Sequence, residues 1–206
     1  SENAKNINRA VNSRLERKQV MNIIGGEKRG SKLALCASKA VRPTAQRTRE
    51  ALFNILQGGR FSLSLSEATV IDLFAGTGAI GLEALSRGAR SCVFVEQDQD
   101  ALQTLQANIS KLKLEDCAHI LAKDVRQIHS WSGPRADLVF ADPPYSSSLA
   151  GEGLHQLVVA NAVVQQALIV VETRKTENCQ LGPEFVLVDS RVYGIARLNF
   201  FTLARR

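Results

Sequence analysis

The sequence lacks the features that would assign it to a membrane, secreted or zinc-binding class. No apolar run approaches the roughly 18–20 residues needed to span a bilayer. The sequence also lacks a charged segment followed by an apolar one, the pattern that would predict secretion. The four cysteines stand far apart without a C-x-x-C pair, and the three histidines have no metal-ligand spacing. We therefore expect a cytoplasmic protein with reduced thiols and no metal site.

Internal repeats and low-complexity tracts are also absent. The 206 residues, 45% hydrophobic and 22% charged, suffice for one to one and a half soluble domains. The net charge of +6 is uneven, because residues 1–60 carry 13 Lys and Arg against 4 Asp and Glu, whereas residues 61–206 carry 13 against 16. This asymmetry indicates either a polyanion-binding face on a mildly acidic body or a solvated basic tail.

The amino-terminal third divides into two segments. Residues 1–20 are polar and basic without periodicity, which predicts a flexible basic extension. Residues 21–60 predict a small β-hairpin, with "MNII" and "KLAL" as its strands, followed by a helix in "RPTAQRTREALFNILQGG" that ends at the glycine pair. Residues 61–206 form the second and larger predicted domain.

From residue 69 onward, strand-like and helix-like segments alternate. The strands are expected at 69–74, 91–96, 118–122, 136–141 and 167–173. Continuous Val, Ile and Leu runs separated by helices predict an α/β fold with a parallel sheet covered on both faces. After residue 183 the order changes to two consecutive strands, a hairpin around Tyr193–Gly194.

A glycine-rich stretch follows the first of these strands. In "DLFAGTGAIGLEAL", Gly76, Gly78 and Gly81 form a G-x-G-x-x-G pattern between a strand and a helix, which indicates a nucleotide-cofactor loop. Dinucleotides place a pyrophosphate at such a helix N-terminus. Asp72, which ends the strand, would repel a pyrophosphate but suits the cationic amino group and sulfonium of S-adenosylmethionine. The loop therefore favours S-adenosylmethionine over NAD.

Acidic residues also end the next two strands. Glu96 closes the second strand, 20 residues after Gly76, and its two oxygens can accept both hydroxyls of a ribose. Asp124 follows the third strand and is placed to bind an adenine amino group. Taken singly, each acid could be a loop carboxylate or a helix cap. Together with Asp72 around one glycine loop, they fit S-adenosylmethionine better than NAD.

The fourth strand ends in the sequence Asp142-Pro143-Pro144-Tyr145. Because parallel sheets bind ligands at the carboxyl ends of their strands, this motif should face the transferable methyl group. Hydrogen bonds from an exocyclic amine to the Asp142 carboxylate and the Pro143 carbonyl would localise the lone pair of the nitrogen, while Tyr145 offers a stacking face for a base. Taken alone, the motif could also be a strand-ending turn with a buried tyrosine.

These stretches resemble a known family. "DLFAGTGAIGLEALSRGA", "VFVEQD", "FADPPY" and "VVET" are similar to class I S-adenosylmethionine-dependent methyltransferases with a D/N-P-P-Y/F motif. "MNIIGGEKRGSKL", "RPTAQRTREALFNIL" and "VYGIARLNFF" narrow the resemblance to bacterial 16S ribosomal RNA guanine-N2 methyltransferases of the RsmD type. It covers about residues 21–203 and leaves residues 1–20 without an assigned role.

The resemblance implies a Rossmann-like, mostly parallel seven-stranded sheet with a C-terminal antiparallel hairpin. It implies methylation of one guanine N2 in small-subunit 16S rRNA, on an assembled particle, by a protein that we expect to be a monomer because the particle leaves little room for a second copy. Asp142, Pro143 and Tyr145 would lie at the reacting base. The implied cofactor contacts are Asp72, Gly76, Gly78, Glu96 and Asp124.

The basic amino-terminal third then acquires a use, since cationic side chains on the hairpin and near the start of the helix could contact RNA phosphates. Each of them could instead be a solvated charge. For Arg47 and Arg49, pairing with Glu50 or bracing of the cofactor loop is a structural alternative. The candidate phosphate contacts are Lys28, Arg29, Lys32, Arg42, Arg47 and Arg49.

Other functions remain open at this point. DNA adenine-N6 and protein-glutamine methyltransferases use related motifs, commonly with Asn at the first position, so Asp142 disfavours them without excluding them. An NAD-dependent oxidoreductase could share the glycine loop, although Asp72 and the Pro-Pro-Tyr segment argue against it. A non-catalytic RNA-binding module with a methyltransferase shell is disfavoured by the intact loop, Glu96 and the Asp142 motif.

Overall fold

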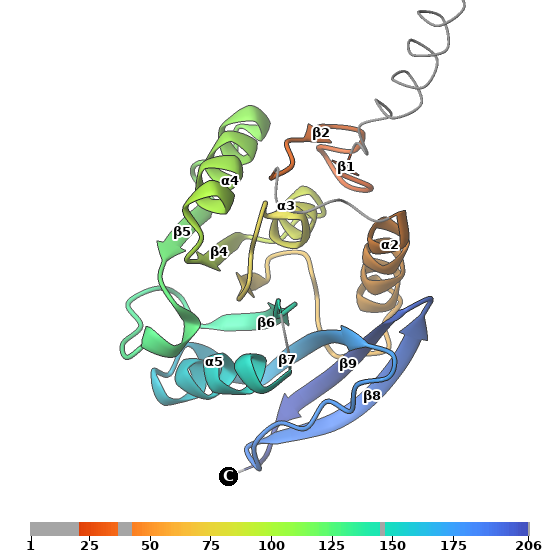
Figure 1. Cartoon of the computed structure of the whole chain (residues 1–206), viewed down its shortest axis with the longest axis vertical. Coiled ribbons are helices and arrows are strands. Elements are labelled where there is room, and N and C mark those ends of the chain that lie inside the picture. Colours follow the sequence, from red (N-terminus) through yellow and green to blue (C-terminus); the bar gives the residue numbers. More distant parts are fainter. Residues whose placement is uncertain (1–20, 37–42, 145–146, 206) are drawn as a thin grey trace, which may run out of the picture.

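A seven-stranded sheet forms the centre of the molecule in the computed structural model, which describes residues 21–36, 43–144 and 147–205 (Figure 1). The strand order is β5-β4-β3-β6-β7-β9-β8. The first five strands in this order run parallel, and β9 is antiparallel to both of its neighbours. The predicted α/β fold and C-terminal hairpin are therefore confirmed. The strands span Thr69–Asp72 (β3), Ser91–Glu96 (β4), Ala118–Ala122 (β5), Ala136–Ala141 (β6), Val163–Arg174 (β7), Phe185–Tyr193 (β8) and Ala196–Leu203 (β9).

Two strands of the seven-stranded sheet differ by two or more residues from their predicted bounds. Strand β3 stops at Asp72 instead of residue 74, because the chain turns there into the glycine loop. Strand β7 begins at Val163, four residues before the apolar run that predicted it. Val163 pairs with Ala136, and the register then shifts before Leu168 pairs with Leu138. The polar Gln165–Gln166 pair falls inside this irregularity, which is why the apolar pattern does not reveal the start of the strand.

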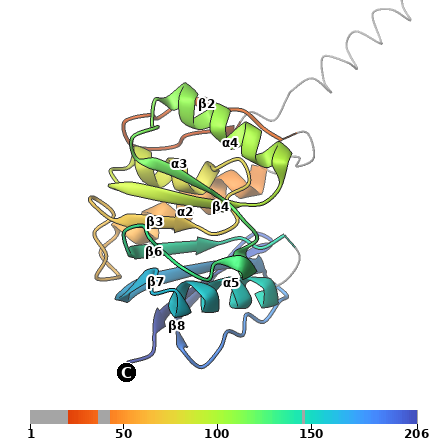
Figure 2. The same cartoon turned by 90° about the vertical axis from the view of Figure 1, so that its left-hand side faces the viewer.

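Helices cover both faces of the sheet, as predicted (Figures 1 and 2). On one face, α2 (Pro43–Gln57), α3 (Ala79–Ser86) and α4 (Gln99–Leu112) pack over a buried cluster that includes Val70, Phe94 and Phe140. On the other face, α5 (Ser147–Val159) and the 3-10 turn η1 (Val125–Gln127) cover a second cluster. Within the described ranges, no helix combines the length and apolar character that a membrane crossing requires.

The N-terminal hairpin consists of β1 (Met21–Asn22) and β2 (Lys32–Leu33), paired antiparallel. It packs on the face formed by α2 to α4, and its apolar residues share one buried cluster with α3 and the sheet. Glu83 of α3 is fully buried and accepts the backbone N–H groups of Ile24 and Gly25, both at 2.8 Å. The described residues of segment 21–60 therefore pack as part of the main core rather than around a core of their own.

Candidate active site

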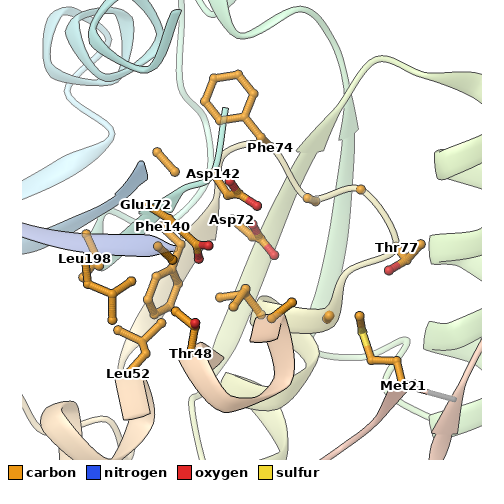
Figure 3. Close-up of a pocket in the computed structure, with 18 of the residues that line it drawn as sticks. Met21, Thr48, Leu52, Asp72, Phe74, Thr77, Phe140, Asp142, Glu172 and Leu198 are labelled. Atoms are coloured by element: carbon orange, nitrogen blue, oxygen red, sulfur yellow. The ribbon is translucent and has the colours of Figure 1, made fainter. Parts of the chain in front are cut away.

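The carboxyl ends of β3, β6 and β7 border a cavity of about 300 Å³, which we call the acidic cavity (Figure 3). Strand alternation places Asp72, Asp142 and Glu172 on the face of the sheet that α2 and α3 cover, in step with the buried Phe140. Among the described residues that line the cavity, these three acids are the only charged ones. The rest of the lining is mostly apolar, with Leu52 of α2 and Leu198 of β9 among it.

Asp72 connects the sheet to the start of the helix behind the glycine loop. Its side chain is 4% exposed, and Oδ2 accepts the backbone N–H of Gly81 at 3.0 Å. That N–H belongs to the first turn of α3, where a dinucleotide pyrophosphate would seek donors. A carboxylate already holds this donor, so the helix start is unsuited to a second anion. The site instead favours a cationic ligand group.

The glycine loop adopts backbone conformations that require glycine. Gly76 and Gly78 have φ angles of 54° and 84°, in the left-handed region. The Gly76 N–H donates to Glu96 Oε2 at 2.8 Å, and Gly76 lines the acidic cavity. A Cβ on Gly78 would lie 2.4 Å from Cδ1 of Leu105 on α4. Gly76 is thus positioned to approach a ligand, whereas Gly78 mainly allows the loop to pack on the helix behind it.

A second cavity, of about 570 Å³, adjoins the first and shares Phe74, Gly76 and Thr77 with it. Glu96 and Asp124 both line this cavity, as expected for residues predicted to bind one cofactor. The structure therefore places four of the five predicted cofactor-binding positions, 72, 76, 96 and 124, in the linings of two adjoining cavities, whereas Gly78 lines neither. Their contacts with a cofactor remain a prediction.

The two acids of the second cavity already carry hydrogen bonds. Glu96 accepts the N–H groups of Gly76, Gln97 and Asp98, so about one of the roughly four acceptor positions of a carboxylate remains for a ribose hydroxyl. Asp124 accepts from the Arg126 guanidinium, with Nη2 and Oδ2 2.6 Å apart, and these hydrogen bonds hold its pKa below the usual range. An adenine amino group would have to share Asp124 with Arg126.

The motif at the end of β6 reaches the acidic cavity through its first residue. Asp142 follows Ala141 directly, is exposed and lines the cavity. Pro143 is half-buried, and Pro144 lines the second cavity. Tyr145 lies outside the described residues, so its predicted stacking role stays a prediction. The motif thus contributes Asp142 to the first cavity and Pro144 to the second.

Glu172, near the carboxyl end of β7, is a candidate that sequence reasoning missed. Burial, reinforced by the negative charge of Asp142, raises the pKa of its carboxyl to about 8. The available signal was the position of a single acid at the end of the apolar run "ALIVVE", the same signal that identified Asp72 and Asp142. The buried Thr48 of α2 also lines the cavity and was missed, since nothing in its sequence surroundings marks it.

The two candidate arginines of α2 have different environments. Arg47 is exposed and adjoins the cavity-lining Thr48, so it is placed to meet a substrate. Arg49 is 3% exposed, donates from Nη2 to the Asn22 carbonyl and has Nε 3.7 Å from Glu83 Oε2. The prediction that Arg49 contacts phosphate is therefore wrong, because its guanidinium is buried. The structural alternative, a brace behind the cofactor loop, matches its position.

None of the three candidate basic residues of the hairpin lines either cavity. The backbone N–H of Lys28 donates to Ser86 Oγ, at the C-terminal end of α3, whereas the glycine loop adjoins the other end of this helix. Eight residues of helix separate these ends by about 12 Å. Arg29 and Lys32 are exposed, and Arg42 lies outside the described residues. Contacts of the hairpin residues with RNA remain predictions, and they require a substrate that extends well beyond the target base.

Comparison with known proteins now decides the family. Residues 21–202 match the family model described as "Conserved hypothetical protein 95". The chain belongs to this family. Two curated relatives are both named "Ribosomal RNA small subunit methyltransferase D". The Escherichia coli K12 protein is 37% identical over a region that covers 73% of this chain and 73% of its own. The Haemophilus influenzae protein is 32% identical over 87% of this chain and 92% of its own. The family resemblance inferred from the motifs is thus confirmed.

Solved structures agree with this assignment. The yhhF protein of Escherichia coli is 30% identical, with a TM-score of 0.76 over 91% of this chain and 99% of its own. The two chains therefore share their fold over most of their lengths. The Rossmann-like methyltransferase fold expected from the resemblance is confirmed.

Proposed function

We propose that this protein transfers a methyl group from S-adenosylmethionine to the exocyclic N2 amine of one guanine in small-subunit 16S rRNA. The observation that carries the proposal is the position of Asp142, at the end of β6 and beside the glycine loop, in a cavity whose charged lining is entirely acidic among the described residues. The names of relatives that are 32–37% identical support the rRNA substrate.

The residues present fit S-adenosylmethionine. Its positive sulfonium and amino groups suit the acidic cavity, and the Asp72 carboxylate already holds the Gly81 N–H that a pyrophosphate would need. Asp72 and Gly76 would hold the amino-acid part of the cofactor, and Glu96 and Asp124 would hold its ribose and adenine. When bound, the cofactor would supply a methyl group activated by the sulfonium charge.

The chemistry that remains for the protein is the activation of a weak nucleophile. The lone pair of an exocyclic amine is delocalised into its ring, and hydrogen bonds to the Asp142 carboxylate and the Pro143 carbonyl would localise it on nitrogen. Positioning and hydrogen-bond polarisation of this kind can supply most of the rate enhancement in a site that excludes water. Tyr145 would provide the stacking face for a base turned out of its helix.

The RNA partner accounts for the basic amino-terminal third of the chain. Arg47 would contact a phosphate next to the target base, and Lys28, Arg29 and Lys32 would reach more distant parts of a folded RNA surface. A large substrate surface of this kind favours the assembled small subunit over free rRNA, and a monomer over a dimer. Ribosomal RNA as the substrate places the reaction in the cytoplasm.

Methyl transfer to three acceptors tests the proposal. Labelled S-adenosylmethionine is incubated with small subunits from cells that lack the enzyme, with protein-free 16S rRNA and with duplex DNA. We expect N2-methylguanine in the subunits. In the Asp142→Ala variant the rate of methylation should fall by at least about 100-fold. The conservative Asp142→Asn variant shows whether charge or hydrogen-bond acceptance matters. Label in DNA alone, or in a glutamine side chain of an added protein, would instead establish one of the rival amine methyltransferases.

A further inference from the structure

Glu172 lies beside Asp142 on the neighbouring strand. In the parallel pair of β6 and β7, Ala141 is the register partner of Val171. One residue further along each chain, Asp142 and Glu172 project to the same face of the sheet, and adjacent strands are about 4.8 Å apart. Figure 3 shows the two carboxyl groups directed into the same cavity, with Asp72 nearby. The proposed reacting base would therefore meet two acids rather than one.

The surroundings of Glu172 are unusual for a carboxylate. The cavity wall around it includes Phe140 from β6 and Leu198, its register partner on β9, and the part contributed by α2 and β9 carries no charge. Among the described residues that line the cavity, the charged groups that share it with Glu172 are Asp142 on β6 and Asp72 on β3, both acids. Burial and the Asp142 charge raise its pKa to about 8. The carboxyl therefore holds a proton at neutral pH but lies close to releasing it.

The proposed reaction leaves one proton to be removed. Guanine N2 begins with two protons and ends with one proton and a methyl group, while the electron pair of the broken sulfur–methyl bond stays on sulfur. The departing proton needs an acceptor within hydrogen-bond reach of N2. Asp142 is already assigned to polarise the amine and Asp72 to hold the cofactor, so Glu172 is the remaining carboxyl group in the described lining of the cavity.

We propose that Glu172 is the proton acceptor for the N2 amine. This inference rests on the proposed function. With the cofactor bound, Glu172 would be held in its ionised form before transfer, because a nearby opposite charge lowers the pKa of an acid. After transfer, the sulfur is neutral and the pKa rises again. The carboxylate then binds the proton that N2 gives up, so the net charge of the cavity is the same before and after methyl transfer.

Proton release on cofactor binding tests this coupling without any RNA. Calorimetric titration at pH 7.0, in two buffers of different ionisation enthalpy, counts the protons released per ligand bound. S-adenosylhomocysteine is the matched ligand, since it shares every group except the methylsulfonium. We expect S-adenosylmethionine to release up to about one more proton than S-adenosylhomocysteine. In Glu172→Gln the difference should vanish. Equal release by both ligands in the wild-type protein would overturn the inference.

Single-turnover methylation of small subunits tests the chemical role. Glu172→Gln keeps the shape and hydrogen-bonding capacity of the side chain but cannot accept the proton, so the rate should fall about 100-fold. The wild-type rate should rise with pH to a plateau, and the residual rate of the variant should lose that dependence. Glu115→Gln, at an exposed carboxyl between α4 and β5, serves as the control and should match the wild type. A Glu172→Gln rate within threefold of wild type would refute the role.

Failures of the two proposals can be told apart. If the rRNA assignment is wrong, the wild-type protein is inactive on subunits, whereas the proton difference between the two ligands persists. If the Glu172 inference is wrong, the wild-type protein methylates subunits and the proton difference is absent. The wild-type titration does not depend on whether the variant folds, and the melting temperature of Glu172→Gln shows whether its rate can be interpreted.

Discussion

The two sides of the site use the same residue types for different purposes. On the glycine-loop side, formed by β3, α3 and β4, the acids Asp72, Glu83 and Glu96 each accept backbone N–H groups. On the opposite side, formed by β6 and β7, Asp142 and Glu172 face a largely apolar cavity and each other. A carboxylate held by amides is part of the scaffold, whereas one held next to another carboxylate is poised to bind cations or protons.

The largest effect on stability is expected at Glu83, the most buried acid of the glycine-loop side. Glu83→Ala removes the acceptor of Ile24 and Gly25 and leaves the guanidiniums of Arg87 and Arg49 without their partner. Loss of one member of a buried ion pair costs about 3–5 kcal/mol. Urea unfolding measures the change, with Glu67→Ala, which breaks the exposed pair with Arg90, as the control. A loss below 1 kcal/mol would show that the network is not structural.

Much of this architecture is visible in the sequence, and the reason is local. The strand-ending acids, the glycine loop and the Asp142 motif each combine a strong apolar run with an abrupt change of residue type, so Asp72, Glu96 and Asp142 can be found without a structure. The different environments of Arg47 and Arg49 cannot be found in this way, because both are arginines near the start of one helix. Only packing against Glu83 reveals which of them is buried.

Glu172 shows a second limit of prediction from the sequence, which concerns contacts between neighbouring strands. Its carboxyl group ends an apolar run as clearly as Asp72 does, but its meaning depends on the strand next to it. The neighbour is set by the order of strands in the sheet, which places β6 between β3 and β7. Register between strands that are distant in sequence brings Asp142 and Glu172 together, and a single sequence contains no direct record of that pairing.

The second prediction concerns the β6–β7 side and gives a stability effect that depends on pH. The pKa of Glu172 is about 8 in the folded protein against an ordinary value of 4.5. Between these values the unfolded chain releases a proton that the folded protein keeps, so the wild-type free energy of unfolding falls as the pH rises, and the loss is complete above pH 8. Glu172→Gln removes this titration. Its stability relative to wild type should therefore increase by up to about 4 kcal/mol between pH 4.5 and pH 9.

Urea unfolding of both proteins at pH 4.5, 7 and 9 measures this difference. Among the acids of the glycine-loop side, Glu96→Gln provides the contrast, since it should lower the free energy of unfolding through lost hydrogen bonds. Its carboxylate accepts three backbone N–H groups, and the amide cannot accept them all. A constant difference between Glu172→Gln and wild type across the pH range would contradict the assignment of the titration to this residue.

A third prediction tests how tightly the start of α3 is held against the sheet. A Cβ on Gly81 would lie 2.3 Å from Phe94 Cε1, so Gly81→Ala must move α3 away from β4 and from the Asp72 carboxylate. Overpacking of this kind costs about 2 kcal/mol, and the affinity for S-adenosylmethionine should fall with it. Gly151→Ala on α5 is the matched control, since its Cβ would meet only Leu181 Cδ2, at 3.7 Å. It should stabilise the protein by about 0.5–1 kcal/mol.

The smallest expected effect separates the two arginines of α2. Arg47→Gln should leave the free energy of unfolding unchanged, because this side chain is exposed. If Arg47 contacts one phosphate, the substitution lowers affinity for small subunits by roughly two- to fivefold and reduces the slope of log affinity against log salt by about 0.7–0.9. Arg90→Gln, at the amino end of β4 and away from both cavities, is the control for loss of one positive charge.

Arg49→Gln should show the reverse pattern. Because its guanidinium is buried against Glu83 and Asn22, its replacement destabilises the protein and leaves the salt dependence of binding unchanged. Affinity measured by filter binding at 50, 100 and 200 mM salt, together with urea unfolding, separates the two residues. If both variants changed the salt slope equally, Arg49 would act through the RNA surface after all. The distinction between residues that stabilise the fold and residues that meet the substrate would then not hold for the two arginines of α2.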